Sequence, residues 1–144
     1  KETLLAVVDL LHHQIREVQP KINIQTESAP YAFAYPAYIH SIFYNLLSNA
    51  IKYRKAERTP EISIQTVEED LSWRIVVTDN GIGIEPKYFD KIFMVFQRLH
   101  DHSEFEGTGI GLAHCLKIAQ LHGGTITVDS EPQVGSSFSV TLPK

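Results

Sequence analysis

The chain has 144 residues, of which 43% are hydrophobic and 21% charged, an ordinary composition for one globular domain with a closed core. Its net charge of -4 argues against a nucleic-acid-binding protein, which normally presents a basic face. A single cysteine, Cys115, excludes a disulfide framework, and no apolar run approaches the ~18 residues of a membrane span. We expect a cytoplasmic domain that is part of a longer protein, whose attachment to a membrane stays open.

The first half of the chain contains helical and extended patterns. Apolar residues recur every three or four positions over residues 3–18 and predict a helix, which a proline two residues later ends. Residues 21–27 alternate apolar and polar side chains and predict a strand, and a short second strand is expected at 31–34. Residues 36–55 begin with a proline and carry a broad apolar stripe, so they predict a second helix.

The second half begins with two predicted strands at 61–68 and 72–79, joined as a hairpin. Periodicity is then lost across residues 80–108, and an irregular loop of this length is usually a lid or a binding loop. A helix over 112–121 follows. Two short helices within the lid and two final strands complete the expected elements: 86–90, 91–96, 126–128 and 138–142.

The order of these elements predicts an α+β fold. We expect a two-layer sandwich in which helices pack on one face of a mixed, mostly antiparallel sheet. The chain contains no internal repeat, low-complexity tract or linker, so we expect residues 1–144 to form a single domain.

Three polar residues lie together on the predicted 36–55 helix. Asn45, Asn49 and Lys52 fall within about 60° of one another around the helix axis, roughly opposite the apolar stripe. A solvated helix face is the ordinary interpretation of such residues. Two asparagines weaken a helix, however, and two amide oxygens beside an ammonium group suit a metal-bound polyphosphate.

Two glycine-rich segments follow. Asp79 ends a strand and leads into Gly81 and Gly83, which let the backbone approach a ligand closely, although a plain turn remains an equal alternative. Residues 107–112 carry three glycines before a helix, where free N–H groups form a ready anion site. Their spacing is neither that of a Rossmann fingerprint nor that of a P-loop.

Together, four segments resemble the N box, first glycine box, F box and second glycine box of sensor histidine protein kinases of two-component systems. These segments are Asn45 to Tyr53, Asp79 to Ile84, Phe93 to Arg98, and Gly107 to Leu112. The resemblance extends from Ile22 to Leu142. It implies a Bergerat-type ATP-binding sandwich with a flexible ATP lid, which transfers the γ-phosphate of ATP to a histidine on a separate phosphoacceptor domain.

The resemblance also implies roles at the phosphate end of the nucleotide. Asn49 would coordinate Mg²⁺, and Asn45 would help to hold the metal or a phosphate. Lys52 would contact the phosphates, and Arg98 would reach the γ-phosphate. Asn45, Lys52 and Arg98 would therefore form the catalytic set. Phosphoryl transfer depends mainly on positioning and charge neutralisation, which these residues supply.

At the base end, the resemblance implies that Tyr53 lies near the adenine or ribose. Asp79 would accept a hydrogen bond from the adenine amino group. Further residues would contact the nucleotide or shape the lid: Gly81, Gly83, Ile84, Phe96, Thr108, Gly109, Ile110, Gly111 and Leu112.

The acceptor histidine of such kinases is not recognisable here. His100-Asp101 lies in the expected lid, and His12-His13 is followed by Gln14 where an acid is expected. The expected partners are therefore a phosphoacceptor helical domain of the same protein and the receiver domain of a response regulator. We expect the isolated chain to be a monomer and the full protein a homodimer.

Two alternatives remain open. The related type II topoisomerases and heat-shock chaperone carry a water-activating glutamate four residues before the metal-binding asparagine, a position that is Asn45 here, so hydrolysis should be slow. The second alternative is that the chain is a degenerate nucleotide-binding module, which signals by docking. The signature motifs of Ser/Thr/Tyr kinases are absent from the sequence.

Overall fold

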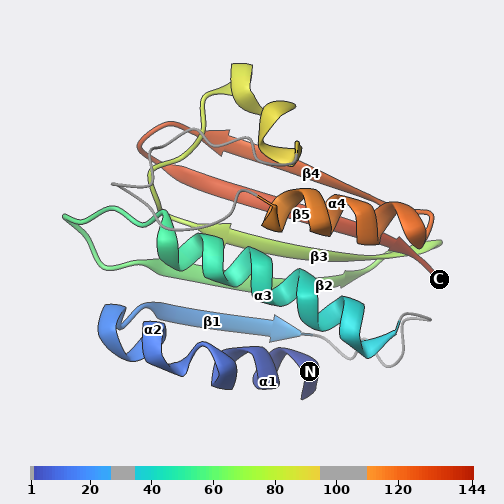
Figure 1. Cartoon of the computed structure of the whole chain (residues 1–144), viewed down its shortest axis with the longest axis horizontal. Coiled ribbons are helices and arrows are strands. Elements are labelled where there is room, and N and C mark those ends of the chain that lie inside the picture. The colour runs from blue at the N-terminus through green and yellow to red at the C-terminus, as the bar shows by residue number, and fades with distance from the viewer. Residues whose placement is uncertain (1, 27–34, 95–109) are drawn as a thin grey trace.

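The computed structural model describes residues 2–26, 35–94 and 110–144, and Figure 1 shows their arrangement. The elements in chain order are α1 (Glu2–Leu10), α2 (His12–Val18), β1 (Lys21–Thr26), α3 (Pro36–Lys52), β2 (Glu61–Glu68), β3 (Ser72–Asp79), the 3-10 turns η1 (Pro86–Tyr88) and η2 (Lys91–Phe93), α4 (Gly111–Leu121), β4 (Thr125–Glu131) and β5 (Gly135–Pro143).

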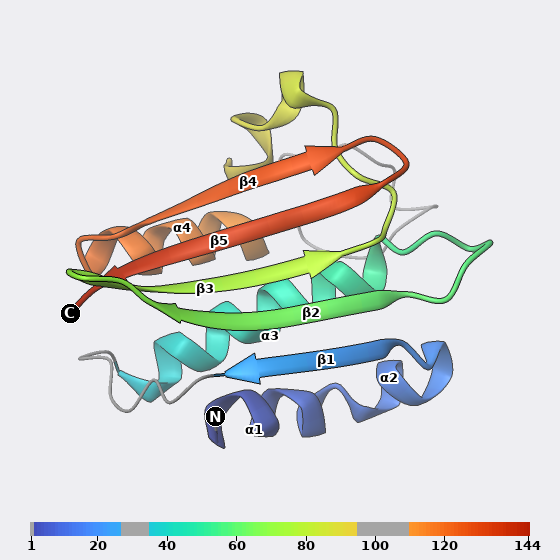
Figure 2. The same ribbon diagram turned by 180° about the vertical axis from the view of Figure 1, so that it is seen from behind.

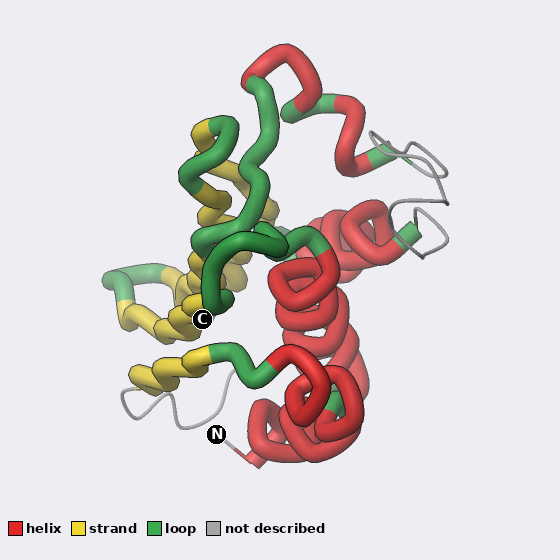
Figure 3. Tube along the Cα trace, turned by 90° about the vertical axis from the view of Figure 1, so that its left-hand side faces the viewer, coloured by secondary structure: helices red, strands yellow, loops and turns green. Residues whose placement is uncertain are grey.

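The five described strands form one sheet in the order β1-β2-β3-β5-β4. The β1–β2 pair is parallel and the other three pairs are antiparallel. The helices α1, α3 and α4 cover one face of the sheet, whereas the view from behind in Figure 2 shows the opposite face without helices. Seen from the side in Figure 3, strands and helices form two layers. The predicted two-layer α+β sandwich is therefore confirmed.

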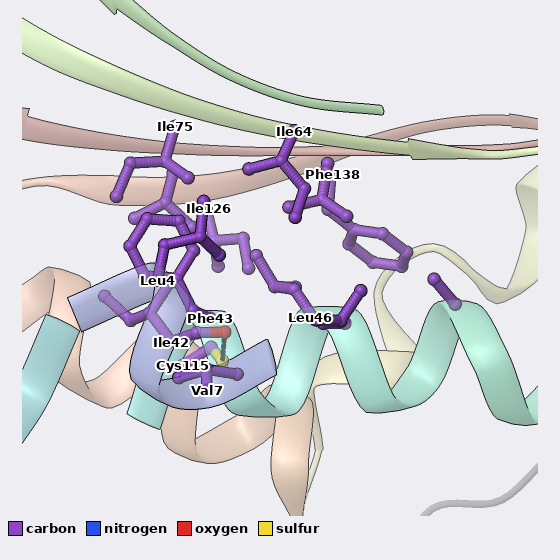
Figure 4. Close-up of a cluster of buried hydrophobic side chains, with 14 of the residues drawn as sticks. Leu4, Val7, Ile42, Phe43, Leu46, Ile64, Ile75, Cys115, Ile126 and Phe138 are labelled. Carbon is purple, nitrogen blue, oxygen red and sulfur yellow. Dashed lines mark hydrogen bonds between the residues drawn. The ribbon is translucent and has the colours of Figure 1, made fainter. Parts of the chain in front are cut away.

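The core lies between these two layers. The predicted apolar stripe of α3 supplies its buried residues: Ile42, Phe43, Leu46, Leu47, Ala50 and Ile51. Alternate residues of the central strands, such as Ile64, Val77 and Val140, belong to the same cluster, and α1 adds Leu4. Figure 4 shows part of this cluster, with Leu4, Leu46 and Ile64 among the labelled side chains. Each fully buried leucine or isoleucine stabilises the fold by about 1.5–3 kcal/mol, so the core fixes where α3 lies on the sheet.

Some predicted boundaries were wrong. The expected helix 3–18 is divided at Leu11, which lies between α1 and α2. Its backbone has φ -90° and ψ 11°, and its side chain is buried. The second helix ends at Lys52 instead of near Lys55, because Tyr53 leaves the helical conformation. The expected lid helices are single 3-10 turns, η1 and η2. The strand expected at 31–34 and residues 95–108 of the expected lid lie outside the described residues.

The ends of several helices and strands that matter for function lie on one side of the molecule, at the left in Figure 1. There α3 ends, β3 ends at Asp79 and β5 begins, with Asp79 paired to Ser136 in the sheet register. No helix in the described ranges combines the length and the hydropathy needed to cross a membrane.

Candidate functional site

The helix α3 carries Asn45, Asn49 and Lys52, all of which are partly exposed. The side chain of Asn49 makes no hydrogen bond to another described residue, so its amide oxygen is available to a ligand. The Lys52 ammonium group lies 4.9 Å from the centroid of the neighbouring Tyr53 ring. These side chains provide an oxygen donor and a cation within one turn of helix.

Asn45 has a more enclosed environment than its position opposite the apolar stripe predicted. Its Nδ2 donates a 2.9 Å hydrogen bond to the Ser41 carbonyl, one turn earlier. Its Oδ1 faces Gly111 so closely that a Cβ at that glycine would lie 2.9 Å away. Burial raises the pKa of the Cys115 thiol on α4 to about 12, and interaction with the Asn45 side chain offsets only part of this rise. Asn45 therefore joins α3 to the start of α4.

The first glycine segment lies against the end of α3. The Ile82 N–H donates a 3.0 Å hydrogen bond to the carbonyl of Tyr53. A Cβ at Gly81 would lie 2.5 Å from the same carbonyl oxygen and 2.9 Å from Oδ1 of Asp79. No side chain fits there without moving backbone, so Gly81 is required for this close approach.

Asp79 is the titratable group that this arrangement perturbs most clearly. Burial raises the pKa of its carboxyl from 3.8 to about 6, although hydrogen bonds from the Gly81 and Ser136 backbones and the charge of Arg58 oppose the rise. A carboxylate that is partly removed from water gains from an additional hydrogen-bond donor, such as a ligand amino group. Perturbed carboxyl groups of this kind are frequent at functional sites.

Asn80 and the turn between β4 and β5 hold this segment in place, and neither was predicted. The Asn80 side chain accepts a 2.9 Å hydrogen bond from the Glu61 N–H and donates one of 3.1 Å to the Thr59 carbonyl. From the β4–β5 turn (residues 132–134), the Gln133 N–H donates a 2.7 Å bond to the Ile82 carbonyl. The sequence contains no signal for the second contact, which joins positions far apart in the chain.

The end of the same segment packs on β4. Gly83 has φ +71°, and a Cβ there would lie 2.0 Å from the carbonyl oxygen of Glu131. The Ile84 N–H donates a 2.8 Å hydrogen bond to Oγ of Ser130. Ile84 itself is partly buried and packs against the core cluster. The glycines and isoleucine predicted here therefore lie in one braced turn.

The second glycine segment is described only from Ile110 onward. Ile110 is exposed at the start of α4, Gly111 contacts Asn45 as above, and Leu112 packs on the core. Of the F box, the Phe93 ring packs edge-on against Phe138 with centroids 6.4 Å apart. The remaining predicted site residues, Phe96, Arg98, Thr108 and Gly109, lie outside the described residues, as does His100-Asp101.

Comparison with known proteins gives an independent view of the chain. Residues 34–144 match the family model described as histidine kinase-, DNA gyrase B-, and HSP90-like ATPase. The chain is 43% identical over 121 residues to cyanobacterial phytochrome A of Nostoc sp., covering 84% of this chain and 16% of that protein. It is 34% identical over 145 residues to sensor protein RprX of Bacteroides fragilis, covering 99% of this chain and 28% of that protein.

Among solved structures, the catalytic domain of histidine kinase ThkA superposes with a TM-score of 0.83 at 27% identity. That match covers 99% of this chain and 92% of the other. The chain therefore spans about the whole of a solved catalytic domain but only 16% to 28% of the lengths of the two sensor proteins above.

Proposed function

This chain belongs to the family of histidine kinase-, DNA gyrase B- and HSP90-like ATPases, as an ATP-binding catalytic domain of the sensor histidine kinase type, and we propose that it transfers the γ-phosphate of ATP to a histidine on a separate phosphoacceptor domain. The observation that carries the proposal is that α3 and the residue that caps its end, Tyr53, contact both glycine segments. Tyr53 lies against Gly81, and Asn45 lies against Gly111. Three motifs that are distant in sequence therefore meet on one helix.

Asp79 is the residue that we assign to base recognition. Its carboxyl is partly buried and lies beside a turn whose backbone is held on both sides. An adenine amino group would supply the hydrogen-bond donor that such a carboxylate favours. Tyr53, at the end of α3, is assigned to the adenine or ribose on the same basis of proximity to the turn.

The phosphates and Mg²⁺ are assigned to the other residues of α3. The amide oxygen of Asn49 suits Mg²⁺, a hard cation that binds oxygen ligands and usually shares them with substrate phosphates. Lys52 would hold the phosphates by charge. When bound, Mg²⁺ would neutralise charge on the phosphate oxygens as the phosphoryl group is transferred. Arg98 keeps its proposed role at the γ-phosphate, although it lies outside the described residues.

For Asn45 we propose a narrower role than direct catalysis. Its amide group is engaged with Ser41 and faces Gly111, which favours a supporting contact between the two nucleotide-binding segments. A carboxamide also cannot act as a general base toward water. Transfer to an external acceptor is therefore favoured over the rapid hydrolysis expected of an ATPase in the same family.

The partners follow from this assignment. The acceptor histidine would lie on a helical domain elsewhere in the same protein, and a response regulator receiver domain would accept the phosphate next. We propose a homodimeric, cytoplasmically placed kinase with a monomeric catalytic domain. Sedimentation of the isolated chain as a dimer at micromolar concentration would contradict the last point.

Calorimetric titration with ATP, with and without Mg²⁺, tests the proposed function. We expect saturable one-to-one binding that Mg²⁺ strengthens, and weaker binding of GTP, whose base presents a carbonyl where adenine presents an amino group. Absence of binding at millimolar ATP would overturn the proposal and favour a docking module. Steady multiple-turnover hydrolysis would favour an ATPase.

A further inference from the structure

We propose that Arg58 is a positioning residue for nucleotide binding, which holds the turn after Asp79 in the shape that base recognition requires. The inference rests on the proposed function, because it concerns the same site. Arg58 lies in the loop between α3 and β2, outside all four motif segments. It follows the last residue of α3, Lys52, by six positions.

The Arg58 guanidinium reaches three backbone carbonyls through a single nitrogen. Its Nη2 donates to the carbonyl of Asn80, to that of Val134 at 2.8 Å and, more weakly, to that of Gly81 at 3.4 Å. The two N–H bonds of Nη2 suffice for the first two acceptors, and the third shares a donor. Turn carbonyls such as these lack strand partners, so a rigid multi-donor group is suited to them.

These acceptors belong to two different turns. Asn80 and Gly81 follow Asp79, whereas Val134 belongs to the β4–β5 turn. The backbone bond from Gln133 to Ile82 joins the same two turns a short distance away. Arg58 therefore adds side-chain hydrogen bonds to this connection between the two turns, and it reduces the conformations available to the Asp79 turn before a ligand binds.

Arg58 also acts on Asp79 through its charge. The positive charge of Arg58 lowers the pKa of Asp79, opposing the larger effect of burial. The other groups that act on this carboxyl are the Gly81 backbone of its own turn and the Ser136 backbone of β5, neither of which titrates. Loss of Arg58 should therefore raise the pKa of Asp79 further and increase its protonated fraction near neutral pH.

The test compares wild type with Arg58→Gln, Arg58→Lys and the control Arg54→Gln. Arg54 lies in the same loop and carries the same charge, but among the described residues its guanidinium donates only to the Ile51 carbonyl of α3, at 3.0 Å. Calorimetry measures affinity for Mg²⁺-ATP and for bare tripolyphosphate. Because charge-assisted hydrogen bonds are lost, we expect Arg58→Gln to weaken ATP binding roughly tenfold, with less than about a twofold change for tripolyphosphate.

The control and the lysine variant separate charge from geometry. Arg54→Gln should leave ATP affinity within about twofold of wild type, which measures the general effect of losing one nearby cation. Arg58→Lys should bind ATP with intermediate affinity, because lysine keeps the positive charge. Its side chain is shorter, however, and lacks the planar, forked guanidinium group. Equal ATP affinity in wild type and Arg58→Gln would overturn the proposal, as would equal losses for ATP and tripolyphosphate.

The pH dependence of ATP affinity gives a readout that a merely structural role would not move. In wild type the affinity should rise with pH through about 6, as Asp79 ionises. In Arg58→Gln the rise should occur at higher pH, whereas Arg54→Gln and Arg58→Lys should resemble wild type. An unchanged midpoint in Arg58→Gln would overturn the electrostatic part of the proposal.

Two further outcomes are distinguishable. If wild type fails to bind ATP, the proposed function is overturned and the inference with it. If wild type binds and only the Arg58 prediction fails, the proposed function stands. Thermal unfolding checks that each variant is folded, and if Arg58→Gln is not, the Arg58→Lys comparison at wild-type-like stability decides the matter.

Discussion

The N–H of Gly81 donates a 2.8 Å hydrogen bond to Oδ1 of Asp79, so the turn after β3 binds the side chain of the residue that precedes it. This bond lowers the pKa of Asp79, but burial outweighs it and brings the value to about 6. The carboxylate is therefore both fixed in direction and incompletely solvated. A group in this condition contributes to ligand binding at some expense of stability.

Asp79→Asn should accordingly increase stability at neutral pH while weakening adenine recognition. Because the folded-state pKa lies above the usual 3.8, the stability linked to Asp79 is complete below pH 3.8 and is lost as pH rises through about 6. Between pH 4 and pH 7.5, the variant should gain about 1–2 kcal/mol relative to wild type, a value reduced for partial exposure. Denaturant unfolding at both pH values checks the sign.

The ligand side of the same prediction uses a different measurement. Asp79→Asn should lose affinity for ATP while binding bare tripolyphosphate as wild type does, because the substitution replaces a carboxylate oxygen that would accept from the adenine amino group with an NH2 group that donates. Comparable losses for both ligands would show that Asp79 supports the whole site and does not recognise the base.

Asn49→Ala should weaken Mg²⁺-ATP binding roughly tenfold or more, because the substitution removes the amide oxygen that we assign to Mg²⁺. The fold should remain intact, since the Asn49 side chain makes no hydrogen bond to another described residue. Ser48→Ala is a suitable control, because Ser48 donates only to the Asn45 carbonyl of its own helix, at 3.2 Å, among the described residues. Equal affinity of Asn49→Ala and Ser48→Ala would remove the metal assignment.

Gly83→Ala should be far more destabilising than Gly123→Ala. Both glycines have positive φ, +71° and +75°, but a Cβ at Gly83 would lie 2.0 Å from the Glu131 carbonyl oxygen, whereas at Gly123 its nearest neighbour is Pro143 at 3.7 Å. The shared backbone penalty is about 1–2 kcal/mol, so we expect roughly that loss at Gly123. At Gly83 a loss above about 3 kcal/mol is expected, since backbone must move. Chemical denaturation measures both, and similar losses would contradict the steric argument.

Gly111→Ala and Asn45→Ala should be coupled. A Cβ at Gly111 would lie 2.9 Å from Oδ1 of Asn45, whose Nδ2 is bonded to Ser41. Alone, Gly111→Ala should destabilise the fold by about 1 kcal/mol, because the clash exceeds the gain in helix propensity. In the Asn45→Ala background the loss should vanish or reverse. A double-mutant cycle with a coupling energy near zero would show that the two residues do not contact in solution.

The fold itself was largely predictable, because hydrophobic periodicity reports which face of an element is buried. The α3 stripe from Ile42 to Ile51 and the bounds of β2 and β3 are those expected from the sequence. Errors occurred where local chemistry competes with packing. Leu11 interrupts the first helix although its side chain continues the apolar pattern. The second helix ends at Lys52, whereas the sequence predicted that it would continue to residue 55.

The sequence alone determined the elements, the apolar face of each helix and the segments that carry candidate ligand groups, because these depend on residue type and local spacing. Only the tertiary structure decided which of those groups meet. Gly81 lies on Tyr53, Gly111 lies on Asn45, and Arg58 reaches Val134 across 76 positions of the chain. Such contacts depend on how the sheet order brings β3, β5 and the end of α3 together, and no pattern within a short window contains that information.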